Sequence, residues 1–140
     1  MSDQRCIDDV QVGDELPTVV RNASRVQLFL YSAATWNPHR IHYDIDYARV
    51  EGHPDVIVHG PLQGAWLSQY VTDWAGPAGR IVGLSWQNRA SALPEQDYEF
   101  RGRVAVVDAE SGIVSLEVWE QGADGAVLMP GTATVTLPKR

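Results

Sequence analysis

Cysteine is nearly absent from the sequence, and long apolar runs are missing altogether. Cys6 is the single cysteine among 140 residues, so an internal disulfide is impossible and the apolar core alone has to hold the fold. No segment approaches the roughly 18 apolar residues that span a bilayer. Residues 1–16, MSDQRCIDDVQVGDEL, are acidic and contain no apolar signal-sequence core. We therefore expect a cytoplasmic protein without a membrane partner, and we interpret Cys6 as incidental, in a mobile N-terminal segment.

Basic residues are also in short supply. Eleven Lys and Arg stand against eighteen Asp and Glu, for a net charge of −7 and a pI near 4.9. Binding to nucleic acid requires basic clusters that neutralise phosphates, so we expect no nucleic-acid partner. Any phosphate-bearing ligand has to be met by a few local arginines.

The length and the ordinary globular composition predict one domain over residues 1–140. A short strand is expected over Glu15–Asn22, followed by a helix with Ser24 as its N-cap that ends near Thr35. Pro38 then favours an irregular segment before a short helix between Asp44 and Gly52. A longer helix begins at Gly60, carries an aromatic stripe at every fourth residue and stops at Gly76.

The second half of the chain reads as strands. Four runs rich in Val, Ile and Thr are separated by turn signals, at residues 79–90, 97–108, 112–121 and 126–137. With the first strand they predict an α+β domain with about five antiparallel strands and one long helix. A sheet that covers such an apolar helix has to curl around it, which is the arrangement of the hotdog fold.

Two segments carry a resemblance to a known family. WNPHRIHYD, residues 36–44, and EGHPDVIVHGPL, residues 51–62, resemble the paired motifs of MaoC-like enoyl-thioester hydratases and dehydratases, in particular the subgroup of mitochondrial 3-hydroxyacyl-thioester dehydratases and mesaconyl-CoA hydratases. A third segment, QYVTDWAGP, is similar to actinobacterial MaoC-like subunits that hydrate steroid side-chain enoyl-CoA esters. The resemblance covers the chain from about Val12 onward and implies a hotdog fold.

The first motif can be aligned in two registers. Matching its Asn-Pro pair would place Thr35 at the acid position and Arg40 at the histidine position, which destroys the chemistry. Matching His-x-Asp places His42 on the family's catalytic histidine, Asp44 on the trailing acid and Asn37 where the wider family has a catalytic Asp. We prefer this second register, because the mitochondrial-type subgroup carries the same Asn.

Water addition to an enoyl thioester needs a base for the water, an acid for C2 and donors for the enolate oxygen. His42 suits the proton transfers, since an ordinary pKa of about 6.5 leaves it mostly neutral at cytoplasmic pH. Asn37 does not titrate, but its amide can hold a water in line with C3. A single imidazole that carries the proton both ways fits a syn addition.

The start of the long helix supplies candidate oxyanion donors. The first N–H groups of a helix are unpaired, and the helix dipole favours negative charge there. Pro61 has no N–H, which leaves Gly60 as the main candidate, ahead of Leu62 and Gln63; Pro61 suits the first helical position. His59 and Leu62 are predicted to border the substrate, with His59 bracing the turn rather than titrating.

Each candidate has a structural alternative. Asn37 can serve as a turn residue before Pro38, and Asp44 is expected to be a helix cap rather than a catalyst. We interpret His39 as a hydrogen-bonding pin and His53 as a solvated loop residue. The stripe of Trp66, Tyr70 and Trp74 is expected in the core or at a subunit interface rather than in an acyl pocket.

A metal site is the less favoured interpretation of the histidines. His39, His42 and Asp44, with His53 or His59, offer ligands suited to zinc or iron, but their spacing fits no standard closed site. We predict no metal and no other cofactor. For the phosphates of CoA or pantetheine the candidates are arginines, since guanidinium groups match phosphates well; they are Arg80, Arg89, Arg101 and Arg103, with Arg89 counted among the substrate-binding residues.

The resemblance implies an (R)-specific enoyl-CoA hydratase, or 3-hydroxyacyl-thioester dehydratase, that acts on a CoA or acyl-carrier-protein thioester. It also implies a homodimer, or a heteromer with a second hotdog subunit. Two alternatives stay open: a non-catalytic subunit that completes the pocket of a partner, and a hotdog thioesterase.

Overall fold

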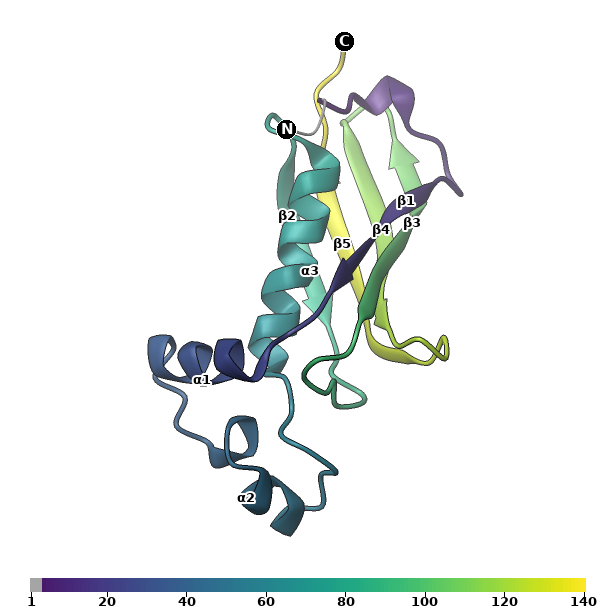
Figure 1. Ribbon diagram of the computed structural model, residues 1–140. Coiled ribbons are helices and arrows are strands. Elements are labelled where there is room, and N and C mark those ends of the chain that lie inside the picture. Colours follow the sequence, from purple (N-terminus) through teal and green to yellow (C-terminus); the bar gives the residue numbers. More distant parts are fainter. Residues whose placement is uncertain (1–3) are drawn as a thin grey trace.

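A computed structural model describes residues 4–140 and contains one antiparallel sheet with a long helix lying across it (Figure 1). The strands are β1 (Glu15–Arg21), β2 (Arg80–Trp86), β3 (Tyr98–Asp108), β4 (Ile113–Gln121) and β5 (Val127–Thr136). Their order in the sheet is β1-β3-β4-β5-β2. The helices are α1 (Arg25–Ala34), α2 (Ile45–Val50) and α3 (Gly60–Ala75), with short 3-10 turns at Ile7–Asp9 and Arg40–His42.

The helix caps explain why these helices begin where they do. The hydroxyl of Ser24 accepts the N–H of Gln27 at 3.0 Å, and a carboxylate oxygen of Asp44 accepts the N–H of Tyr47 at 3.1 Å. Helix α3 ends at Gly76, which has a φ of 79° that favours glycine. The element boundaries predicted from these residues are confirmed to within a few positions.

The sheet curls around α3 because the strands are interrupted by bulges. The pairing register shifts between Leu16 and Val19, between Ile81 and Gly83, and between Val104 and Val106. Such bulges bend a strand and increase its twist. The concave face thereby encloses Leu67 and Val71 of α3, each worth about 1.5–3 kcal/mol when fully buried.

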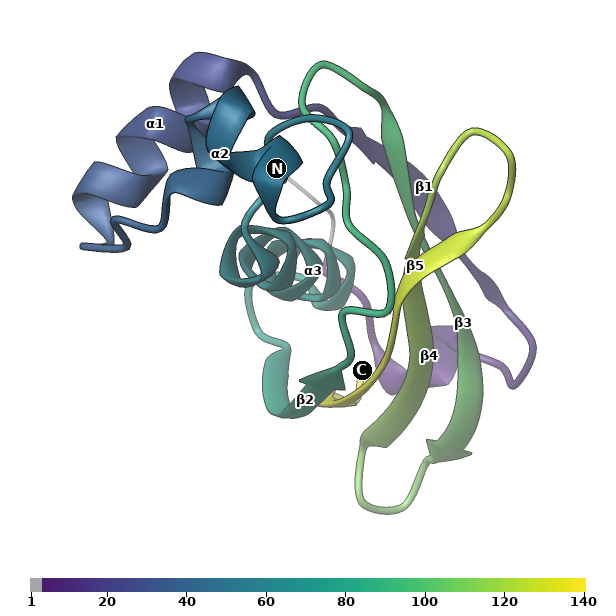
Figure 2. The ribbon, with the colours of Figure 1, turned by 90° about the horizontal axis from the view of Figure 1, so that it is seen from below.

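Viewed from below, α1 and α2 lie together beside the first turns of α3, away from the sheet (Figure 2). A second, smaller apolar cluster joins them to the rest of the protein and includes Leu28, Ala48 and Leu62. The segment between α1 and α3 is the one that carries all four histidines of the chain, so this packing decides where the candidate site lies.

Residues 7–10 contribute Ile7 and Val10 to the main core, which differs from the expected mobile N-terminal segment. Ile7 is buried, and its N–H donates to the carbonyl of Pro138 at 2.9 Å. Ile7 is apolar and precedes the acidic residues Asp8 and Asp9, and its burial holds this segment against the core. The local sequence did not show where Ile7 would pack. Within residues 4–140, no helix is long and apolar enough to cross a membrane.

Candidate active site

His42 ends the 3-10 turn between α1 and α2 and is 7% exposed. Its Nδ1 lies 2.8 Å from the carbonyl oxygen of Ile57. Because a carbonyl can only accept, Nδ1 carries the proton, and Nε2 of the neutral ring keeps its lone pair. Burial lowers the pKa of His42, although the bond to Ile57 opposes that effect. At neutral pH, His42 is therefore an uncharged base whose basic atom is Nε2.

His59 stacks directly on His42. The ring centroids are 3.7 Å apart and the planes differ by 18°. His59 is 0% exposed, and its Nε2 shares a hydrogen bond of 2.7 Å with the hydroxyl of Ser32. Burial, followed by the neighbouring ring of His42, lowers the pKa of His59 to about 4. His59 is therefore neutral and packs behind His42, while its predicted contact with substrate stays a prediction.

Helix α3 presents one free donor beside this pair. His59 is its N-cap, so Gly60 rather than Pro61 takes the first helical position. The N–H groups of Leu62 and Gln63 both donate to the carbonyl of His59 at 3.1 Å. The N–H of Gly60 has no acceptor among residues 4–140, and the positive end of the helix dipole lies there. Of Gly60, Leu62 and Gln63, only Gly60 therefore has an N–H left for another acceptor, and its role as an oxyanion donor stays a prediction.

Asn37 lies half-buried at the end of α1, between Trp36 and Pro38. Its Oδ1 accepts the N–H of His39 at 3.3 Å, and its backbone N–H donates to the carbonyl of Ser32 at 2.9 Å. The side chain therefore forms the turn before Pro38, in agreement with the structural alternative for this residue. Its predicted role in holding the attacking water stays a prediction.

Three hollows surround the segment that carries these groups. His42 borders one of about 290 Å³ together with Arg25, Phe29, Tyr43, Ile45 and Val56. Gly60 borders a second, of about 190 Å³, in which the predicted residues Gly60 and Arg89 meet. Leu62 packs in the smaller apolar cluster instead, and its predicted contact with substrate stays a prediction. The two hollows are lined by consecutive residues of one extended segment, Val56 in the hollow of His42 and Ile57 with Val58 in the hollow of Gly60.

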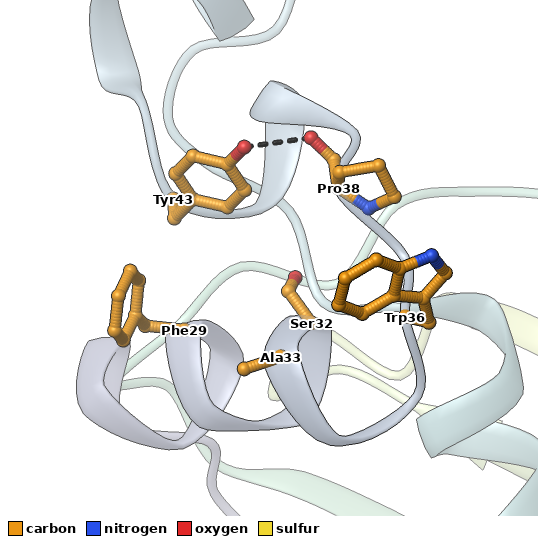
Figure 3. A pocket seen from close by; sticks show the side chains of 6 residues that line it. All are labelled: Phe29, Ser32, Ala33, Trp36, Pro38 and Tyr43. Carbon is orange, nitrogen blue, oxygen red and sulfur yellow. Dashed lines mark hydrogen bonds between the residues drawn. The ribbon is translucent and has the colours of Figure 1, made fainter.

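The third hollow is apolar and adjoins the first, sharing Phe29 and Tyr43 with it. It has a volume of about 290 Å³, and the exposed ring of Trp36 closes one side opposite Phe29 (Figure 3). The hydroxyl of Tyr43 donates to the carbonyl of Pro38 at 2.6 Å, which fixes the upper wall. Ser32 also lines this hollow, and its hydroxyl is hydrogen-bonded to Nε2 of His59. The apolar hollow therefore adjoins the histidine pair through Ser32.

The remaining polar residues of the motif have structural roles. Asp44 caps α2, as predicted, and pairs with Arg40 at 2.6 Å, which holds the pKa of the Asp44 carboxyl below its usual range. Nδ1 of His39 accepts the N–H of Ile41 at 3.3 Å, so His39 is the predicted pin, and His53 lies half-buried in the loop after α2. In the described part of the chain, no three His, Cys, Asp or Glu side chains gather closely enough to hold a metal ion.

The four candidate arginines occupy different surroundings. Arg101 and Arg103 lie on β3 and pair with Glu99 at 3.7 Å and Glu117 at 2.6 Å. Arg80 is exposed at the start of β2. Arg89 alone of the four borders the hollow of Gly60, and its predicted contact with the substrate stays a prediction.

Ser32 was missed at the sequence level, although it holds His59 in place. Leu28 and Ser32 are the two buried residues of α1 and lie four positions apart, on one helical face. The sequence did not single out that face, because Val26, Phe29 and Leu30 of the same helix are also apolar but lie exposed.

A five-stranded antiparallel sheet curled around one long helix, with a buried histidine in the segment before that helix, is the arrangement of a MaoC-like protein with the hotdog fold. Residues 10–93 match the family model of hydroxyacyl-thioester dehydratase type 2. This chain belongs to that family.

Relatives with assigned names point the same way. Mesaconyl-C(4)-CoA hydratase of Chloroflexus aurantiacus is 35% identical over 106 residues, which are 75% of this chain and 35% of that protein. The chain thus spans about a third of that relative. The beta subunit of 3-oxo-4,17-pregnadiene-20-carboxyl-CoA hydratase of Mycobacterium tuberculosis is 27% identical over 92% of this chain and 96% of its own length. A solved MaoC-like dehydratase has a TM-score of 0.87 at 28% identity, over 98% of this chain and 43% of its own.

Proposed function

We propose that this chain is a hydro-lyase that reversibly adds water to a trans-2-enoyl thioester, preferably a CoA ester. The observation that carries the proposal is the state of His42, whose Nδ1 is tied to the carbonyl of Ile57 while Nε2 keeps a lone pair. The free N–H of Gly60 supplies the complementary electrophile. The names of the relatives, two hydratases and a solved MaoC-like dehydratase, support the same reaction class.

The reaction follows from these two groups. Nε2 of His42 takes a proton from water while the water oxygen bonds to C3, and the electrons of the C2–C3 double bond move onto the thioester oxygen. The N–H of Gly60 donates to that enolate oxygen. The enolate then collapses and C2 takes the proton back from the imidazolium of His42, so that one imidazole serves one face of the substrate. Asn37 holds the water in this scheme, and the syn addition gives the (R)-3-hydroxyacyl product.

The residues that line the hollows support one orientation of the bound thioester. Its carbonyl lies at Gly60 with the pantetheine toward Arg89, and its acyl group lies in the hollow of His42, which continues past Phe29 and Tyr43 into the apolar space of Figure 3. The lining is apolar there, as an acyl group requires. This chemistry uses side chains and backbone alone and needs no cofactor.

We further propose that the working protein contains two hotdog domains, as a homodimer or as a heteromer with a second hotdog subunit. This chain spans about a third of mesaconyl-C(4)-CoA hydratase but nearly all of a relative that is named as a beta subunit. The carrier of the acyl group, CoA or acyl carrier protein, is recognised in this proposal through the pantetheine and phosphate groups that both share.

A non-catalytic subunit is the second candidate function, and the bond from the N–H of His39 to Asn37 is the observation that favours it. A side chain used in a turn has fewer hydrogen bonds left for a water. A hotdog thioesterase is less favoured. It would need a free carboxylate, but Asp44, the carboxylate nearest in sequence to His42, already binds Arg40 and accepts the N–H of Tyr47 at the start of α2.

Product analysis tests the proposal. Purified protein is incubated with crotonyl-CoA, a medium-chain enoyl-CoA and a steroid side-chain enoyl-CoA, and the products are separated on a chiral column while free thiol is measured. The (R)-3-hydroxyacyl ester without thiol release supports the hydratase. Thiol release identifies a thioesterase, and an inert chain that becomes active with a second hotdog subunit identifies the partner role.

A further inference from the structure

A chain of polar side chains crosses the otherwise apolar space between the sheet and α3. Glu120 of β4 is 0% exposed, and its Oε2 accepts Nε2 of Gln63 from α3 at 2.6 Å. Burying such groups is costly unless they are hydrogen-bonded. Apolar side chains of similar volume would avoid that cost altogether, so the presence of this pair calls for a reason other than stability.

The same chain continues to the protein surface. Nδ2 of Asn88, in the segment after β2, donates to Oε1 of Gln63 at 3.3 Å. The other end of the Asn88 amide packs against Gly60: a Cβ atom on Gly60 would lie 2.9 Å from Oδ1 of Asn88. The three side chains therefore lead from the middle of the sheet to the first residue of α3.

That end point is the proposed oxyanion donor. Gly60, Gln63, Asn88 and Arg89 border the same hollow of about 190 Å³. Asn88 is held by Gln63 and packs against Gly60, so a continuous line of contacts connects Gly60 to the buried carboxyl group of Glu120 in the sheet.

We infer that Glu120, Gln63 and Asn88 are positioning residues for the Gly60 N–H, and that the amide of Asn88 forms one wall of the thioester subsite. The inference rests on the proposed hydratase function for its kinetic consequences. Burial raises the pKa of Glu120 to about 7, and Oε1 has no partner among residues 4–140, so below that pH the anchor is an uncharged carboxyl group. The proposed role of Glu120 requires only the oxygen that accepts the hydrogen bond from Gln63.

Substitutions of the anchor test this role. Glu120→Gln keeps an oxygen that accepts the Gln63 bond, whereas Glu120→Leu and Gln63→Leu remove the bond with apolar side chains of comparable size. We expect Glu120→Gln to keep kcat within about twofold, and the two leucine variants to lower kcat about tenfold or more with a smaller change in KM, because a misplaced oxyanion donor acts on the transition state.

A spectroscopic measurement keeps the inference separate from the hydratase proposal. The amide resonance of Gly60 is followed by NMR in the full chain of wild type and each variant, with circular dichroism to show that each is folded. We expect the Gly60 resonance to shift or broaden in Glu120→Leu and Gln63→Leu but to stay in place in Glu120→Gln. If it stays in place in the folded leucine variants, the positioning role is wrong, whether or not the protein hydrates an enoyl thioester. If it moves and the wild type is inactive on enoyl thioesters, the hydratase proposal fails while the positioning of Gly60 stands.

Discussion

At the scale of single residues, the two stacked imidazoles of the site are held in the same charge state by different surroundings. His42 is tied at Nδ1 by a carbonyl and leaves Nε2 available, whereas His59 is tied at Nε2 by Ser32 and is enclosed completely. A second positive charge at a centroid distance of 3.7 Å would be unfavourable. Both rings are therefore neutral, and because only His42 keeps any exposed surface, it is the proposed base.

The pH dependence of activity follows from His42. Its pKa is lowered by burial, so the basic form persists below the ordinary value of about 6.5. We predict that kcat/KM for hydration stays constant as the pH falls to about 6.5 and declines only below it. A pH series with a substrate that does not titrate measures this limb. An acid limb centred well above 6.5 would contradict the assignment of a buried, neutral His42.

His59 and Glu120 should influence stability in opposite directions as the pH changes. The folded pKa of His59, about 4, lies below its ordinary 6.5, so its contribution is complete above pH 6.5 and is lost toward pH 4. The folded pKa of Glu120, about 7, lies above its ordinary 4.5, so its contribution is complete below pH 4.5 and is lost as the pH rises through 7. Each is worth up to about 3 kcal/mol, and in the wild type they offset one another.

Two variants that do not titrate at these positions separate the contributions. Between pH 4.5 and 6.5, the melting temperature relative to wild type should fall with rising pH in His59→Gln and should rise in Glu120→Gln. Thermal melts at several pH values measure both differences. Parallel pH curves for wild type and both variants would show that neither group has a shifted pKa.

At the scale of secondary-structure elements, the sequence predicted the boundaries well because local residues decide them. Ser24, Asp44 and Gly76 start or stop helices through bonds to nearby backbone. Contacts between distant segments were not predictable in the same way. The stack of His59 on His42 depends on how the loop after α2 folds back, and strand order depends on the whole sheet. The inward position of Glu120 had a signal: it continues the alternation of Val114, Leu116 and Val118 on β4.

The close approach of α3 to β2 gives a stability prediction. A Cβ atom on Gly64 would lie 2.2 Å from the ring of Trp86. In an open helix position, replacing Gly with Ala stabilises by about 1 kcal/mol, but here overpacking should reverse the sign, and we expect Gly64→Ala to destabilise by about 1–3 kcal/mol. Urea unfolding measures the difference.

The control is the double variant Gly64→Ala with Trp86→Leu, which removes the ring that the new methyl group meets. Compared with Trp86→Leu alone, it should be as stable or more stable. Destabilisation of equal size in both backgrounds would mean that the contact between Gly64 and Trp86 is not the cause.

At the scale of the whole molecule, the sheet has two edge strands, β1 and β2, and β2 carries the more exposed apolar residue. Strand β2 pairs with β5 on one side only, at the end of the strand order, and Val82 on it is 60% exposed. Exposed apolar edge strands favour pairing with another chain unless they are covered. The assembly that this chain forms is therefore expected to use this edge.

We predict a mass in solution of about twice the 15.5 kDa of one chain for the purified protein, or for its complex with a second hotdog subunit. Val82→Lys, which places a charge on the edge, should shift the species toward the monomer. Light scattering coupled to size exclusion measures this. The substitution Val106→Lys, at an exposed position of β3 that pairs with Ser115 of β4 and lies far from β2 in the strand order, is the matched control and should leave the assembly intact.

The central claim is that His42 hydrates an enoyl thioester, and the loss of enoyl absorbance on mixing the purified chain with crotonyl-CoA tests it most directly. Wild type should consume the enoyl absorbance without releasing thiol, and His42→Gln, which cannot act as a base, should be slower by about 10²-fold or more. Equal rates for wild type and His42→Gln would contradict the account.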